Sequence, residues 1–320
     1  MRFEDKVAEL RIKKHKGKET KEFLEDIKAL ANGEAYEYLL GSVDFCGAKI
    51  DLSLRPMIPR PETEFWVAIA IAKEKEVRSK EKEGKSEMAT PFRLLDMFAG
   101  SGNVGLAFLK NINDCTVDFI EYDPKLKKQI EISIEKNKGS SKLVGGVLYR
   151  NSLRSYKRVA SYAVLNLFMS SLGRSIKDYF FTSLLARQNK IDTARANVMV
   201  GDTFLPLSRQ DLDKSRSDLD KYDVITAVPP YVPPQMKNEV MEELHAEDPL
   251  SFFDKEDGYY YHKQVLSNAK EFLNDGGTLY LEFDITQREK IEELAKEFGW
   301  TNYSFLKDPY GHEFVIKLEK

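Results

Sequence analysis

The sequence has few of the residues from which disulfide frameworks, metal sites and membrane spans are built. Its 320 residues include two cysteines, Cys46 and Cys115, and four histidines that show no metal-ligand spacing. We therefore expect a reducing compartment, no disulfide scaffold and no metal. No apolar run approaches the roughly 18 residues of a membrane span, and the N-terminus is too polar for a signal peptide. The expectation is a cytoplasmic protein that does not contact a membrane.

An excess of charge of one sign is also missing from the chain as a whole, although not from one segment. The net charge is −3, which does not indicate non-specific binding of nucleic acid by the whole chain. Residues 142–195, however, carry ten Lys and Arg against two Asp, a net of +8, and the remainder carries −11. Apolar residues at helical spacing over 159–186 predict a basic helical insertion at about 138–197. Its apolar face either packs on the body of the protein or docks a partner, nucleic acid included.

The pattern of apolar segments predicts an α/β fold. From residue 92 onward, strands (92–97, 116–120, 198–200, 222–227, 278–283 and 314–318) alternate with helices (103–109, 124–137, 258–273 and 286–298). Such alternation predicts a mostly parallel, Rossmann-like sheet with helices on both faces, and the last two strands could form an antiparallel edge pair. Upstream, 3–31 is expected to be helical, 43–50 a hairpin and 62–74 a helix, with 75–90 a polar linker or an exposed helix end. We divide the chain into a short N-terminal region, 1–57, and a main domain, 58–320, and expect a monomer.

Three segments at predicted strand ends are typical of a nucleotide-like ligand site. The strand 92–97 runs into a glycine-rich turn (Phe98, Ala99, Gly100, Ser101 and Gly102) and then a helix, whose N-terminus supplies free N–H groups. Glu121, followed by Tyr122, ends the next strand and can accept both hydroxyls of a ribose. Asp202 follows the third strand and could accept from an adenine amino group, with Thr203 or Phe204 against the ring. Open α/β sheets bind ligands at these carboxyl ends.

The fourth strand end, Val228-Pro229-Pro230-Tyr231, supplies the acceptor side of the predicted site. The two prolines hold the chain extended, so that the Pro229 carbonyl can point outward as a hydrogen-bond acceptor. Tyr231 offers a flat face for a planar group. In class I methyltransferases a turn of this kind holds a planar amino or amide nitrogen against the methyl donor, with Asn or Asp before the prolines. Val228 offers no hydrogen bond of that kind.

Several separate motifs make the chain similar to the PrmC/HemK family, the glutamine N5-methyltransferases of peptide-chain release factors. They are residues 38–41 with 45–47, Ile58-Pro59-Arg60-Pro61-Glu62-Thr63-Glu64, 98–102, Glu121, 201–204, 248–250 with 257–258, and 276–282 with Gln287. The resemblance implies S-adenosyl-L-methionine as donor, S-adenosyl-L-homocysteine as product, and the Gln of a release factor's Gly-Gly-Gln loop as acceptor. It also implies a substrate-side loop at Arg60, Pro61, Glu62 and Thr63, and a helical N-terminal part that grips the release factor.

The chain departs from the family pattern in its short N-terminal part, in the segment 138–197, and in having Val-Pro-Pro-Tyr where the family has Asn-Pro-Pro-Tyr. Three hypotheses therefore remain open. The first is a release factor glutamine methyltransferase that is either slow or has the missing contact supplied elsewhere. The second is a homologue that binds S-adenosylmethionine without catalysis. The third is a methyltransferase of nucleic-acid amino groups, because Pro-Pro-aromatic turns also serve adenine and guanine.

Overall fold

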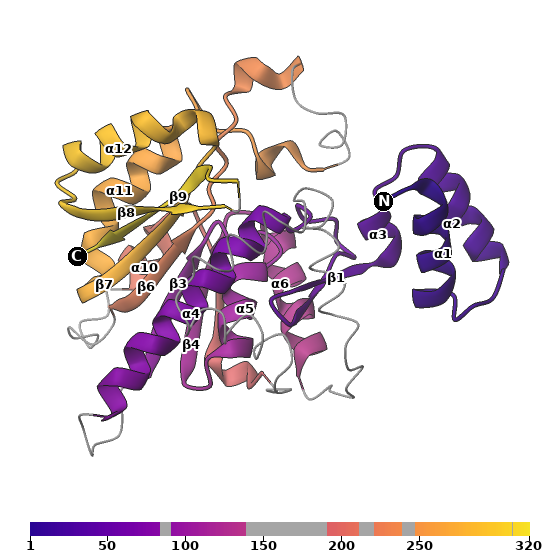
Figure 1. Cartoon of the computed structure of the whole chain (residues 1–320), viewed down its shortest axis with the longest axis horizontal. Helices are drawn as coiled ribbons and strands as arrows, with labels where there is room; N and C mark the ends of the chain where they lie inside the picture. The colour runs from indigo at the N-terminus through magenta and orange to yellow at the C-terminus, as the bar shows by residue number, and fades with distance from the viewer. Residues whose placement is uncertain (84–90, 139–190, 211–220, 239–246, 309) are drawn as a thin grey trace.

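The centre of the molecule is a seven-stranded sheet with helices on both faces (Figure 1). The computed structural model describes residues 1–83, 91–138, 191–210, 221–238, 247–308 and 310–320. The strand order is β5-β4-β3-β6-β7-β9-β8. The first five of these strands are parallel, and β9 is antiparallel to both β7 and β8. Because the chain enters at β3, moves outward to β5 and returns to β6, the order reverses between β3 and β6, where ligands bind in such sheets.

The elements follow one another as the alternating pattern predicted. The strands of the sheet are β3 (Phe92–Met97), β4 (Cys115–Glu121), β5 (Ala196–Val200), β6 (Tyr222–Ala227), β7 (Leu273–Glu282), β8 (Asn302–Lys307) and β9 (Glu313–Glu319). The helices around it are α4 (Pro61–Glu83), α5 (Asn103–Asn111), α6 (Pro124–Asn137), α10 (Leu205–Gln210), α11 (Tyr260–Phe272) and α12 (Arg288–Glu297). Short 3-10 turns are η1 (Thr193–Arg195), η3 (Pro234–Asn238), η5 (Pro249–Ser251) and η6 (Ile285–Gln287).

The α/β fold class is confirmed, and three elements were missed by the sequence predictions. One is the strand β8, so the antiparallel edge consists of β7, β9 and β8 rather than a pair. The others are the helices α3 (Tyr36–Leu40) and α10, whereas α4 continues as far as Glu83, in agreement with the exposed helix end predicted as one alternative for 75–90. Of the predicted basic insertion, residues 139–190 lie outside the described part of the chain, and its end at 193–197 forms η1 and the start of β5.

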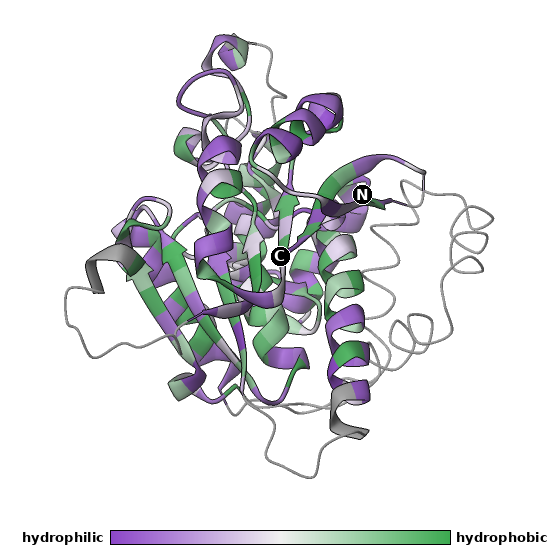
Figure 2. Ribbon diagram, turned by 90° about the vertical axis from the view of Figure 1, so that its left-hand side faces the viewer, coloured by the Kyte–Doolittle hydropathy of each residue, from purple (hydrophilic) through white to green (hydrophobic). Residues whose placement is uncertain are grey.

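Two apolar clusters, one on each face of the sheet, form the main core. The strands between them are largely hydrophobic, as the green colour in Figure 2 shows. Successive side chains of a strand point to opposite faces. In β6, Val224 belongs to the cluster under α4 and α5, whereas Ile225 and Ala227 belong to the cluster under α11 and α12. The central strands are buried on both faces, as expected of parallel strands covered by helices. Their carboxyl ends are thereby held in fixed register.

The N-terminal helices have a small core of their own. They are α1 (Phe3–Lys13), α2 (Lys21–Ala31) and α3 (Tyr36–Leu40), and they lie to one side of the sheet in Figure 1. Leu10, Phe23 and Tyr36 are buried among them. The Thr20 hydroxyl caps α2 by accepting from the backbone N–H of Phe23 at 3.2 Å. A helical N-terminal region is present, as expected, whereas its boundary at residue 57 stays a prediction.

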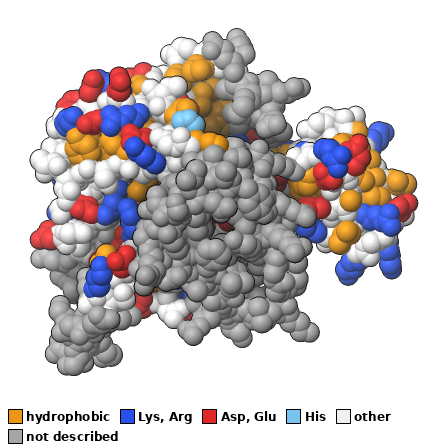
Figure 3. Space-filling model, viewed as in Figure 1, with side chains coloured by type: hydrophobic (Ala, Val, Ile, Leu, Met, Phe, Trp, Pro, Cys, Tyr) orange, Lys and Arg blue, Asp and Glu red, His pale blue; other side chains and the backbone are white. Residues whose placement is uncertain are grey.

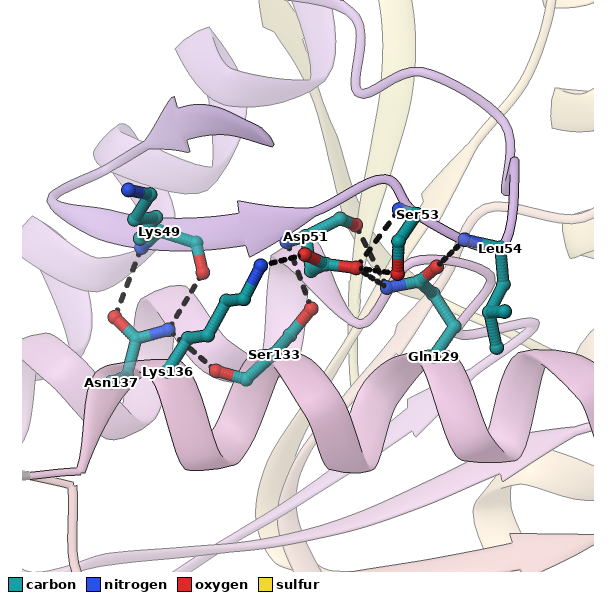
Figure 4. Close-up of polar contacts among 8 residues, drawn as sticks. All are labelled: Lys49, Asp51, Ser53, Leu54, Gln129, Ser133, Lys136 and Asn137. Atoms are coloured by element: carbon teal, nitrogen blue, oxygen red, sulfur yellow. Dashed lines mark hydrogen bonds and ion pairs between the residues drawn. The ribbon is translucent and has the colours of Figure 1, made fainter. Parts of the chain in front are cut away.

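The hairpin β1 (Ser42–Phe45) and β2 (Ala48–Asp51) joins these helices to the sheet through a row of polar bonds to α6 (Figure 4). Asn137 accepts from the backbone N–H of Lys49 at 2.9 Å and donates to its carbonyl at 2.7 Å. The Ser133 hydroxyl accepts from the N–H of Asp51 at 3.0 Å, and Gln129 accepts from the N–H of Leu54 at 2.7 Å. The donors and acceptors of the β2 edge therefore find partners on one face of a helix.

In the described part of the chain, no helix is long and apolar enough to cross a membrane. Among the same residues, no group of three or more His, Cys, Asp and Glu side chains could hold a metal ion.

Candidate functional site

The predicted site residues come together along the carboxyl edge of the sheet. In register, Met97 of β3 lies beside Ala227 of β6, and Ala227 lies beside Leu281 of β7. On the other side, Glu121 of β4 lies beside Val200 of β5. The segments that follow these strands are therefore neighbours, although they are up to about two hundred residues apart in sequence. They surround the reversal in strand order between β3 and β6.

The glycine-rich turn adopts the left-handed backbone conformation at alternate positions. Phe98, Gly100 and Gly102 have φ of 55°, 53° and 77°. A Cβ added to Gly100 would meet nothing nearer than the Phe98 carbonyl at 3.9 Å, whereas one on Gly102 would press on Ile130 at 3.0 Å. Gly100 thus leaves open space for a ligand at the backbone, and Gly102 allows α5 to pack on α6. Gly102 is also the N-cap of α5, and no side chain caps that helix.

Glu121 is a buried carboxylate that holds this turn in place. Its Oε2 accepts from the N–H of Gly100 at 2.7 Å, and its Oε1 accepts from the N–H of Asp123 at 3.0 Å. Burial raises the pKa of Glu121, whereas these backbone donors favour its charged form. The next side chain, Tyr122, is 63% exposed. A carboxylate with remaining lone pairs therefore lies beside an accessible aromatic ring.

Asp202 is engaged by a residue that the sequence did not indicate. Lys255 Nζ lies 2.8 Å from Asp202 Oδ2 and also over the rings of Tyr260 and Tyr261, at 4.9 and 5.1 Å from their centroids. The pair is partly exposed, so the ion pair contributes little to stability. Thr203 has φ of 46° and is partly buried.

Phe204 was one of two residues suggested to lie against the adenine ring. It is instead buried and stacked on Phe272 at 4.6 Å between ring centroids. Of the two suggested residues, Thr203 is therefore the one that does not belong to the apolar core.

The side chain of Gln287 links the acceptor turn to Gly258. Gln287 donates from Nε2 to the carbonyls of Tyr231 and Gly258, at 3.3 and 3.0 Å. A Cβ on Gly258 would lie 2.8 Å from the Tyr231 carbonyl, and Gly258 has φ of +88°. Pro229 is buried, while Val228, Pro230 and Tyr231 are partly buried. Burial and the nearby Glu282 raise the pKa of the Tyr231 hydroxyl, which therefore stays neutral.

The substrate-side loop is tied to the same edge by buried acids. Arg60 donates to Glu247 at 2.8 Å, and the Glu247 side chain is only 2% exposed. Thr63 Oγ1 and Trp66 Nε1 donate to Glu282 Oε2 at 2.9 and 2.6 Å. Pro61 and Glu62 are exposed at the start of α4.

The sequence pattern missed the acids and the lysine that hold the predicted segments. They are Asp96, Glu247, Lys255 and Glu282, of which only Glu282 stood within a family motif, 276–282, and without an assigned role. Asp96 and Glu282 lie within or at the end of apolar strands, and an acid in such a strand is a signal that could have been used. Glu247 and Lys255 follow no strand, and their partners lie 187 and 53 residues away.

These residues would fit S-adenosylmethionine, the methyl donor that the family resemblance implies. The space at Gly100 and the uncapped N-terminus of α5 suit the carboxylate of an amino acid. Glu121 suits a ribose diol, and Tyr122 and Asp202 suit an adenine ring and its amino group. Methyl transfer from sulfur is then a matter of placing the acceptor in line at the carboxyl end of β6.

The relatives to which this chain is similar are methyltransferases. No family model matches the chain. The chain is 25% identical over 304 residues to a release factor glutamine methyltransferase of Streptococcus pneumoniae, covering 94% of this chain and 81% of that protein. It is 24% identical over 288 residues to one of Thermodesulfovibrio yellowstonii, covering 90% of this chain and 77% of that protein. A methyltransferase structure from Pyrococcus furiosus matches with a TM-score of 0.45 and 13% identity, over 86% of this chain and 89% of that one.

The resemblance to this family is thereby confirmed over most of the chain. The strand order and these relatives identify the fold as that of a class I methyltransferase, with S-adenosylmethionine as its cofactor.

Proposed function

We propose that this methyltransferase acts on the amide nitrogen of the Gln in the Gly-Gly-Gln loop of a release factor. The observation that carries the proposal is the similarity over 94% of the chain to a release factor glutamine methyltransferase, with the Pro-Pro-Tyr turn at the carboxyl end of β6. The amide is planar and a poor nucleophile, because its lone pair is delocalised. The work of the protein is therefore to orient the amide and to stabilise charge.

We assign a role to each site residue from its position at the carboxyl edge of the sheet. Residues 98–102, Glu121, Tyr122, Asp202 and Thr203 bind the donor. The carbonyl of Pro229 accepts one amide hydrogen, while Tyr231 and Pro230 confine the plane of the amide. Arg60, Pro61, Glu62 and Thr63 form the loop on the substrate side. Arg60 and Thr63 fix that loop to Glu247 and to Glu282 at the end of β7 by hydrogen bonds.

The N-terminal helices supply a surface for the release factor. Phe3, Ile12 and Leu24 are 44%, 69% and 59% exposed. In Figure 3 apolar side chains lie on these helices together with Lys and Arg. Exposed apolar side chains that alternate with cations on these helices would suit a protein partner.

Mass spectrometry of the Gly-Gly-Gln peptide tests the proposal. A purified release factor is incubated with S-adenosylmethionine and either this protein or its Val228→Asn variant. We expect this protein to add one methyl group to the Gln. If neither form modifies the peptide while both bind S-adenosylhomocysteine, release factor methylation is rejected. In that case RNA and DNA acceptors come next, with nuclease treatment and salt dependence as controls.

A further inference from the structure

Glu282, an acid on the neighbouring strand β7, lies close to Val228. The register of β6 and β7 pairs Val224 with Thr278 and ends with Ala227 beside Leu281, and Val228 and Glu282 are the residues that directly follow this last pair. Paired residues of parallel strands point to the same face. Val224, Tyr280 and Val228 all pack in the cluster under α4, so Glu282 points to that face too.

Only one of the two carboxylate oxygens of Glu282 accepts hydrogen bonds from protein side chains. Both of its side-chain donors, Thr63 Oγ1 and Trp66 Nε1, bind Oε2. Among the described residues, no donor reaches Oε1. The residue as a whole is 4% exposed, but Oε1 is not among the described side-chain atoms that are fully buried without a partner, so this oxygen keeps contact with solvent. The second oxygen is thus available to a ligand at the carboxyl end of β7.

Glu282 is also electrostatically close to the acceptor turn. After burial, its charge is the largest cause of the raised pKa of the Tyr231 hydroxyl. The turn therefore has a neighbouring acid on the side of Tyr231 and of Val228. Val228 itself contributes only apolar contact.

We propose that Glu282 Oε1 binds the acceptor amide of the substrate and supplies a hydrogen bond that Val228 cannot make. The inference rests on the proposed function. One amide hydrogen is accepted by the Pro229 carbonyl and the other by Oε1. The amide nitrogen takes the methyl group as the S–C bond breaks and leaves its electron pair on sulfur. The proton that the nitrogen then loses passes to Oε1 and on to solvent.

A double-mutant cycle between positions 228 and 282 tests this role. Glu282→Gln can still accept from Thr63 and Trp66 through its one oxygen, but presents an NH2 group instead of Oε1. With Val228 present, we expect Glu282→Gln to lower kcat for release factor methylation about 10²-fold. With Val228→Asn, the Asn supplies the polar contact, and the same change lowers kcat no more than about tenfold, so the effects are not additive.

A merely structural role would give the same loss in both backgrounds, and that result would overturn the inference. Affinity for S-adenosylhomocysteine, measured by calorimetry, and the melting temperature show whether the variants are folded. Should Glu282→Gln fail to fold, Glu282→Asp gives the cycle a second variant, because it withdraws the carboxylate without removing its charge.

Different experimental results would reject the role of Glu282 and the proposed release factor methylation. Equal losses in both backgrounds reject the role of Glu282 and leave the proposed function intact. Activity of the Val228→Asn variant alone also rejects it, because Glu282 then does not replace the missing contact. If no form methylates a release factor while S-adenosylhomocysteine binds, the proposed function is rejected, and with it the inference.

Discussion

At the scale of single residues, the site depends on buried acids that face backbone N–H groups. Glu121 accepts from Gly100 and Asp123, and Asp96 Oδ2 accepts from the N–H of Gly105 at 2.8 Å. Asp96 Oδ1 accepts from the Thr226 hydroxyl at 2.9 Å, which joins β3 to β6. These bonds fix the turn and the strands that carry the ligand.

Replacing Glu121 should weaken donor binding more than it weakens the fold. Glu121→Ala removes an acceptor from the ribose site and releases the Gly100 N–H. Each lost bond to a charged group costs roughly 1.5–3 kcal/mol, so we expect Kd for S-adenosylhomocysteine to rise roughly 10- to 100-fold. Titration calorimetry measures this. Glu131→Ala, on the exposed face of α6, is the control and should leave Kd unchanged.

Asp96 should make stability depend on pH. Burial is the main cause that raises its pKa from 3.8 to about 7. The folded protein therefore binds a proton that the unfolded chain releases, and stability falls as pH rises from 3.8 to about 7. The part lost is about 4 kcal/mol at most, at about 1.4 kcal/mol per pH unit. In urea unfolding, Asp96→Asn should flatten this slope. An unchanged slope would contradict the assignment.

At the scale of elements, the sequence predicts regular secondary structure well where the pattern is local. The predicted bounds of β3, α6 and β6 agree with the structure. The strand β8 was missed because it is a short edge strand whose residues are mostly exposed or half-buried, so that the alternation of Tyr303 and Phe305 with Asn302 and Ser304 covers only four residues. The helix α3 was missed because it has only five residues and no side chain that caps it. The strand ends gave the position of the site, whereas the partners of Asp202 and Thr63 depend on contacts between distant segments.

The acceptor turn should be sensitive to any side chain at Gly258. In Gly258→Ala the Cβ meets the Tyr231 carbonyl at 2.8 Å in a backbone conformation with φ of +88°. We expect release factor methylation to fall by at least about tenfold, while S-adenosylhomocysteine still binds. Gly276→Ala is a matched control, since Gly276 has φ of +77° and nothing lies within 4 Å of its Cβ. Equal effects of the two variants would show that backbone strain alone is responsible.

The bonds between α6 and β2 should contribute to stability. Asn137→Ala leaves the N–H and the carbonyl of Lys49 without this partner, at a cost of roughly 1–3 kcal/mol. The free energy of unfolding in urea measures the loss. Glu135 lies on the exposed side of the same helix, and Glu135→Ala should change stability by less than about 0.5 kcal/mol.

At the scale of the whole molecule, the N-terminal helices and the sheet have separate apolar cores. The helices should therefore affect substrate binding rather than the chemistry at the sheet edge. Ile12→Asp with Leu24→Asp should lower kcat/KM for a release factor about tenfold or more, without altering affinity for S-adenosylhomocysteine. Val77→Asp, at a 51% exposed position on α4, is the control. If kcat/KM is unchanged by the pair, this face does not contact the substrate.

The hairpin also sets an order of events during synthesis. Its bonds to α6 join residues 75 to 88 positions apart, so β2 cannot be anchored until the chain through Asn137 has left the ribosome. At about 5–20 residues per second this takes roughly 4 to 18 seconds. Throughout that interval the nascent N-terminal helices and hairpin are linked to the ribosome without the helix that will anchor them.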